Sequence, residues 1–188
     1  MTTQVEAWLR GPVPGVPPLL MPAAHALMHA EEDAARALEG LTAGQIWMKR
    51  SSAASVGYHL RHIAGSIDRL CTYARAGALT EAQQSQRRAE SSTPSPLPDA
   101  SALTIEVKQA VAAALDQLRH TPPDTLLDER GVGRLGVPSN VIGLLFHAAE
   151  HAARHAGQAL TTAKLVKDEG RRTKDGGRGA SEGMTNDE

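Results

Sequence analysis

Apolar side chains recur every three or four residues in four separate segments of this chain, and no segment shows the sustained alternation that is typical of strands. The second segment is the most regular, with apolar residues at Val56, Leu60, Ile63 and Ile67. The spacing predicts four amphipathic helices, over about residues 23–41, 52–75, 99–120 and 138–167. Four such helices of comparable length predict an all-α fold, a four-helix bundle.

Proline, glycine and charged residues divide the rest of the chain into a lead-in, two connections and a tail. Residues 1–22 are expected to form an extended, proline-rich lead-in packed on the bundle, because prolines at this density exclude a helix interior. The bundle occupies residues 23–167 and contains two long connections, 78–100 and 122–137, of which the first is expected to be a loop. The remaining residues, 168–188, are glycine-rich and almost free of apolar side chains, which predicts a disordered tail.

Composition excludes several classes of protein. The formal net charge is −1 and aromatic residues make up only 3% of the chain, so neither a basic surface nor a set of stacking groups favours nucleic acid as a partner. Cys71 is the single cysteine, which excludes an intrachain disulfide and any multi-cysteine metal site, and we expect it to be a buried thiol. The sequence has neither a signal-peptide pattern nor a membrane-spanning apolar run, which predicts a cytoplasmic protein without a membrane partner.

Histidines concentrate in two of the predicted helices. The last helix carries His147, His151 and His155, spaced so that they stack along one face, where two imidazoles can share one metal ion. Histidines with this spacing are more often core or interface residues than metal ligands. The segment also lacks the HExxH pattern of zinc proteases. A second cluster, His59 and His62, lies on the second helix. A shared metal would satisfy both clusters, with three imidazoles and open coordination positions, but periodicity leaves open whether His59 or His62 is the third ligand.

Two segments resemble the DinB/YfiT-like superfamily, namely HLRHIAGSIDRL (59–70) and HAARHAGQ (151–158), within longer similar stretches at 56–83 and 144–166. The resemblance implies a four-helix bundle with up-down-down-up topology. It also implies that His62, His151 and His155 bind a divalent transition metal, Zn or Ni first, with Fe or Cu as alternatives. His59 and His147 then become candidates to orient a ligand or to contact substrate.

The function implied by the resemblance is a metal-dependent enzyme, and the catalytic residues themselves stay unassigned. The substrate would be a small molecule, a low-molecular-weight bacterial thiol, whose sulfur the enzyme transfers to an electrophile or uses in a related reaction. The alternative is a non-catalytic metal-binding or stress-response protein that acts through dimerisation or ligand binding. Relatives are often dimers, which predicts a homodimer. Two further expectations concern single residues: Arg69 in a surface ion pair, and Glu150 as a solvated acid.

Overall fold

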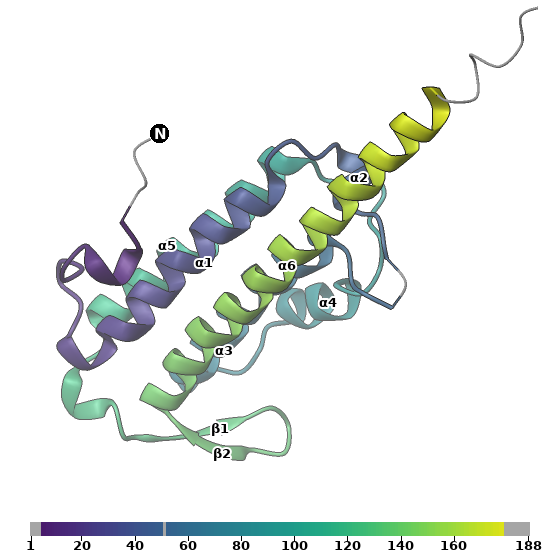
Figure 1. Ribbon diagram of the computed structural model, residues 1–188. Coiled ribbons are helices and arrows are strands. Elements are labelled where there is room, and N and C mark those ends of the chain that lie inside the picture. Colours follow the sequence, from purple (N-terminus) through teal and green to yellow (C-terminus); the bar gives the residue numbers. More distant parts are fainter. Residues whose placement is uncertain (1–4, 51, 179–188) are drawn as a thin grey trace, which may run out of the picture.

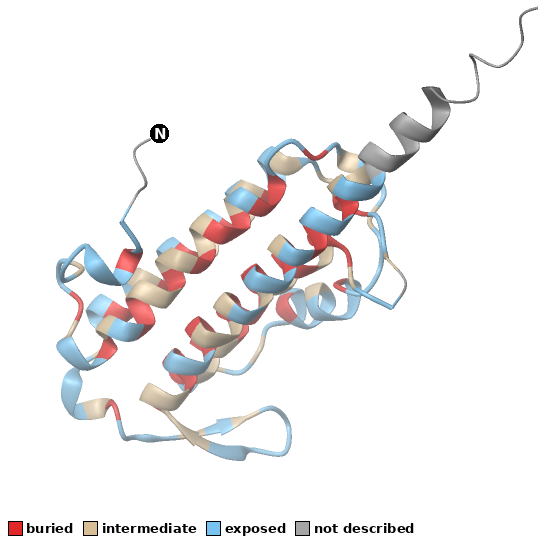
Figure 2. Cartoon of the chain, in the orientation of Figure 1, coloured by how far each residue is buried: buried red, intermediate tan, exposed pale blue. Residues whose placement is uncertain are grey.

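Four long helices form the body of the protein, as the sequence predicts (Figure 1). The structure is a computed structural model that describes residues 5–50 and 52–178, with side chains described as far as residue 169. The long helices are α1 (Met21–Leu38), α3 (Val56–Ala74), α5 (Ala100–His120) and α6 (Val141–Arg178). Each has a buried face made largely of apolar side chains that is turned toward the other helices (Figure 2). The all-α four-helix bundle is therefore confirmed.

The directions of the helices follow from contacts near their ends. Gln117 Nε2 donates to the carbonyl of Cys71 at 3.1 Å, so the last turns of α5 and α3 lie side by side and these two helices are parallel. Arg119 Nε donates to the carbonyl of Pro14 at 3.2 Å, which places the end of α5 beside the lead-in to α1. Helices α1 and α6 run in the same direction and opposite to the other two (Figure 1). The order along the chain is therefore up-down-down-up.

Helix α6, the last of the four long helices, packs against both α1 and α3 (Figure 1). The inner face of α6 combines large side chains, such as Leu144 and Leu145, with fully buried alanines. The alanines of α6 with no exposed surface are Ala149, Ala152, Ala156 and Ala159. Because alanine side chains are short, the helix axes can approach closely, and residues on the edges of α3 and α6 come within contact distance.

The two connections contain structure that the sequence does not predict, and the assignment of residues 78–100 as a loop is wrong. The first holds α4 (Glu81–Ala89), which begins with a capping box in which Thr80 and Gln83 satisfy each other's backbone N–H groups. Its only buried side chain is Gln83, so an apolar stripe is missing. The second connection holds the antiparallel hairpin of β1 (Glu129–Val132) and β2 (Val137–Asn140). Its four-residue strands are too short for alternation to be detected.

Four smaller elements complete the fold over residues 5–50 and 52–178. A short helix, α2 (Ala43–Ile46), precedes α3, and single 3₁₀ turns form at Ala7–Leu9, Pro18–Leu20 and Pro123–Thr125. In the lead-in, Val16 and Leu20 are buried against the bundle, whereas Leu19 is exposed. Residues 1–4 lie outside the described residues.

The last helix extends further than the sequence analysis predicts. It ends at Arg178 rather than near Lys167, so the predicted disordered tail from residue 168 is wrong over 168–178. Arginine and lysine in this stretch favour a helix but Gly170, Gly176 and Gly177 oppose it, so helix propensity alone does not account for the extension. An ion pair between Arg50 and Glu169 also connects this extension to the segment before α3. Residues 179–188 lie outside the described residues.

Candidate metal centre

Helices α3 and α6 carry the two histidine clusters. The start of α3 is set by Ser55, whose Oγ accepts from the backbone N–H of Tyr58 at 3.2 Å. His59 and His62 therefore lie in the first two turns of α3, while His151 lies in the first third of α6. None of the helices within residues 5–50 and 52–178 is both long and apolar enough to cross a bilayer.

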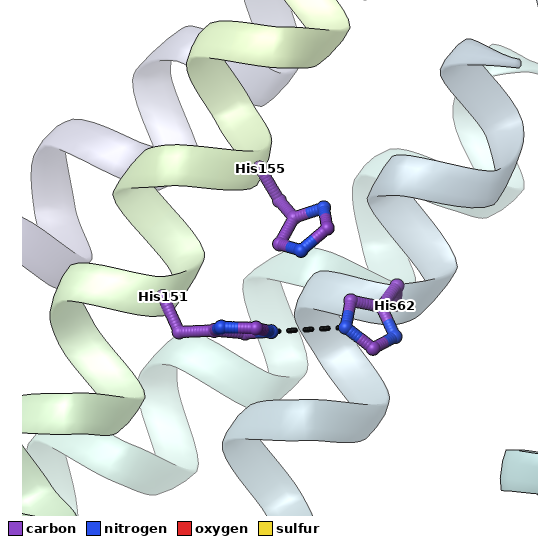
Figure 3. Close-up of side chains that lie close together, drawn as sticks. All are labelled: His62, His151 and His155. Carbon is purple, nitrogen blue, oxygen red and sulfur yellow. Dashed lines mark hydrogen bonds between the residues drawn. The ribbon is translucent and has the colours of Figure 1, made fainter. Parts of the chain in front are cut away.

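Three imidazole rings converge between the two helices (Figure 3). His62 Nε2 lies 2.9 Å from His151 Nε2, and the ring of His155 lies over this contact. The ring centroids of His155 are 4.5 Å from His62 and 4.6 Å from His151. Each of the three residues offers one ligand atom, and these three atoms lie within 4.8 Å of one another. The structure thus brings together the three residues that the resemblance singles out.

The electrostatics of the cluster keep two of the rings neutral. Burial, followed by the proximity of His62, lowers the pKa of His151 from 6.5 to about 4, and the same causes lower the pKa of His155 to about 4. Burial also lowers the pKa of His59. A neutral imidazole has one nitrogen with a lone pair, which is the form that binds a metal ion.

The outer nitrogens of the cluster have their own partners. His62 Nδ1 lies 2.8 Å from Glu90 Oε2, and His155 Nδ1 lies 3.0 Å from His59 Nδ1. A carboxylate accepts, so the proton of His62 belongs on Nδ1 and the lone pair on Nε2 faces the centre of the cluster. The contact with His59 likewise leaves Nε2 of His155 free. His151 Nδ1 has no hydrogen-bond partner in the described part of the chain.

This donor set fits a divalent transition metal. Three imidazole nitrogens from two helices suit Zn, Ni, Fe or Cu, and they do not suit a hard cation such as Mg²⁺, which prefers oxygen ligands. Three protein ligands also leave coordination positions for water or substrate, the arrangement of catalytic rather than structural sites. The residues present therefore fit the ion, while its identity is not determined by them.

A second group of potential ligands shares one residue with the first. His147, Glu150 and His151 also offer ligand atoms within 4.8 Å of one another, but all three lie on α6. His147 is exposed, its Nδ1 lies 2.8 Å from Glu150 Oε1, and its ring centroid is 5.3 Å from that of His151. Glu150 also accepts from Arg154 at 2.6 Å, which lowers the pKa of its carboxyl. Arg154 thus competes for the carboxylate, and the three-imidazole group is the stronger candidate.

Next to the cluster, Arg69 differs from the sequence-based expectation, and Glu90 is a residue for which the sequence provides no expectation. Arg69, expected in a surface ion pair, is buried and donates to Glu90 Oε1 at 2.5 Å and to Oε2 at 3.2 Å. Burial opposes ionisation of Glu90, but the hydrogen bonds from His62 and Arg69 outweigh it, and the pKa of Glu90 lies below its ordinary value. Arg69 follows His62 by two helical turns, a spacing that could have placed both on one face. Glu90 belongs to a segment without apolar periodicity, and no local signal identifies it.

Cys71 lies in the core and takes no part in the cluster. Burial raises the pKa of its thiol to about 11, and the prediction of a buried thiol is confirmed.

Two cavities flank the three-histidine cluster. One, of about 330 Å³, is lined by Trp47, Lys49, Tyr58 and Glu90 together with serine and threonine side chains. The ring of Tyr58 stacks on that of His62 with 7° between the planes, so it separates this cavity from the rings. The other, of about 460 Å³, is lined by His59 and by the outer face of α6.

Comparisons with known proteins agree with this fold. The family model of the DinB superfamily matches residues 4–159. A crystal structure of a conserved protein from Enterococcus faecalis is 20% identical and superposes with a TM-score of 0.62, over 79% of this chain and 97% of that one. At this identity the likeness concerns the fold. No curated protein matches the chain.

Proposed function

We propose that this chain, which belongs to the DinB superfamily, uses His62, His151 and His155 to bind a divalent transition metal and to act on a low-molecular-weight thiol. Zn or Ni is the first expectation, with Fe or Cu as alternatives. The observation that carries the proposal is the convergence of three imidazoles, two of them held neutral by burial, from α3 and α6.

The chemistry depends on a coordination position that the protein leaves open. A bound ion of this kind lowers the pKa of a thiol that occupies such a position, so the sulfur reacts as thiolate at neutral pH. The residues of the chain orient the rings: Glu90 accepts from His62, and His59 contacts His155. The side chain of His62 is 19% exposed, so a small molecule can reach the cluster from solvent. The cavity lined by His59, whose ring contacts His155, offers room for the rest of a substrate.

Metal content in a set of variants tests the metal site. His62→Ala and His155→Ala each remove a ligand of the three-imidazole group only, whereas His147→Ala and Glu150→Gln affect only the second group. We expect about one transition metal ion per wild-type chain, loss of that ion in the first two variants, and retention in the other two. Retention in His62→Ala and His155→Ala would contradict the assignment. Circular dichroism of every variant checks that the helices are intact.

Thiol consumption tests the reaction class. Wild-type protein loaded with metal, incubated with a small thiol and an electrophile such as chlorodinitrobenzene, is expected to consume the thiol faster than metal-free protein or His155→Ala. Unchanged turnover after metal removal would contradict the thiol chemistry. Metal binding without any thiol consumption would instead favour the non-catalytic metal-binding alternative. The homodimer stays a prediction, which light scattering on the full chain would test.

A further inference from the structure

Glu90 connects the metal centre to a buried arginine. It caps the C-terminal end of α4, and its carboxylate accepts from His62 Nδ1 at 2.8 Å and from both terminal nitrogens of Arg69. Residue exposures of 5% for Glu90 and 8% for Arg69 show that the ion pair is out of solvent. A buried charge pair of this kind is costly unless its geometry and its remaining hydrogen bonds are complete. Here the carboxylate makes a further hydrogen bond, because Glu90 Oε2 accepts from the imidazole of His62.

The surface of α3 is shaped to receive this carboxylate. A Cβ on Gly65 would overlap Glu90 Oε1 and would lie 2.7 Å from Arg69 Nη1. A glycine inside a helix costs about 1 kcal/mol relative to alanine, so α3 gives up local stability at the point where the ion pair needs room. Gly65 lies inside α3, neither in a turn nor at a helix end, so the room that it leaves serves the ion pair.

Helix α4 holds Glu90 in place although it has no apolar stripe. Gln83, its one buried side chain, donates through Nε2 to Asp68 Oδ2 and to Thr72 Oγ1, both at 2.8 Å. The capping box at Thr80 fixes the first turn of the same helix. Polar contacts to α3 thus anchor the beginning of α4, and its end places Glu90 against His62.

We propose that Glu90 is a positioning residue, which keeps the proton of His62 on Nδ1 and aims the Nε2 lone pair at the metal centre, with α4 as its support. The part that concerns the metal rests on the proposed function, whereas the part that concerns the His62 tautomer does not. Without the carboxylate, His62 would populate the other tautomer and other ring orientations, and the apparent metal affinity would fall with the fraction that remains competent. Removal of such outer partners weakens metal binding by about 10- to 100-fold.

The first test compares two carboxylate variants. Glu90→Gln removes the charge at nearly constant shape, and Glu106→Gln is its matched control, since Glu106 is half-buried on α5 and accepts from Gln86 instead of a histidine. In competition titrations with a chelator, Glu90→Gln is expected to bind Zn²⁺ about 10- to 100-fold more weakly than wild type. Glu106→Gln is expected to stay within about two-fold of wild type, because it touches no proposed ligand.

The second measurement needs no metal. Nitrogen-15 spectra of the imidazole groups in the metal-free chain distinguish the two tautomers, and His62→Gln identifies the signals of His62. We expect the Nδ1–H form of His62 in wild type and in Glu106→Gln, and a mixture of tautomers in Glu90→Gln. A purely structural role of Glu90 would lower stability and leave the tautomer unchanged.

A third comparison disturbs the carboxylate without removing a polar group. Gly65→Ala must displace Glu90, whereas Gly44→Ala adds a Cβ with nothing within 4 Å. Weaker Zn²⁺ binding in Gly65→Ala alone would support the proposal. If wild type and Glu90→Gln bind Zn²⁺ equally and His62 keeps its tautomer, the positioning role is overturned and the metal site stands. If wild type binds no Zn²⁺, the proposed function fails, and the nitrogen-15 spectra alone decide the role of Glu90.

Discussion

Acid should destabilise the metal-free protein through His151 and His155. Both rings have a pKa of about 4 in the folded chain, lowered from 6.5 chiefly by burial. Between these values the unfolded chain binds protons that the folded chain does not bind. The contribution of these two rings to the free energy of unfolding is therefore fully present above about pH 6.5, and it decreases as the pH falls toward about 4.

The magnitude follows from the size of the pKa difference. A difference of about 2.5 corresponds to ~3.4 kcal/mol for one group. Both rings are partly exposed, and solvent screens part of this free-energy difference. We therefore count about half of it for each ring, which gives ~3 kcal/mol for the pair. Single domains are stable by about 5–15 kcal/mol, so a loss of this size is readily measured.

Urea unfolding in the presence of a chelator, followed by circular dichroism from neutral pH to about pH 4, measures this loss. The double variant His151→Gln/His155→Gln is the comparison, since it lacks both titrating rings and retains all other ionisable groups. Wild type is expected to lose ~3 kcal/mol more than the double variant over this range. Parallel pH profiles for the two proteins would show that burial does not hold these rings neutral.

Three further predictions concern the core around the site. Leu145 is fully buried, so Leu145→Ala should lower the free energy of unfolding by ~2–5 kcal/mol, whereas Leu165→Ala, on the exposed side of α6, should change it by less than about 0.5 kcal/mol in urea titrations. A Cβ on Gly57 would lie 2.7 Å from the ring of Trp47, so Gly57→Ala should lower the melting temperature in calorimetry, and an unchanged value would disprove the contact. Alkylation of Cys71 by iodoacetamide, followed by mass spectrometry, should be slow in the folded chain and fast in urea; rapid alkylation of the folded chain would show that the thiol is accessible.

The long helices can be predicted from the sequence because each buries one continuous apolar face. In α3, for example, Leu60, Ile63 and Ile67 are all buried, and their spacing alone indicates the helix. Helix α4 cannot be found in this way, because its buried contact is the amide of Gln83. The end of α6 is missed for a related reason, since its last turns extend beyond the apolar stripe into a glycine-containing segment whose composition does not indicate a helix.

The candidate site, too, can be predicted from the sequence only in part. Spacing within one helix pairs His151 with His155, but the choice between His59 and His62 depends on how α3 packs against α6, which periodicity does not describe. In the structure His62 contacts His151, while His59 lies against the outer nitrogen of His155. The resemblance to the family is what selects His62 from the sequence. Glu90 requires the tertiary structure, because it reaches His62 from a helix that the sequence does not predict.

The proposed function requires one metal ion among three imidazoles from two helices. Crystals of the zinc-loaded full chain, with diffraction data collected on both sides of the zinc absorption edge, would show whether the ion is there. We expect one anomalous peak about 2.0–2.1 Å from ring nitrogens of His62, His151 and His155. A peak bound by His147 and Glu150 instead, or the absence of any peak at the cluster in zinc-loaded crystals, would contradict the proposed function.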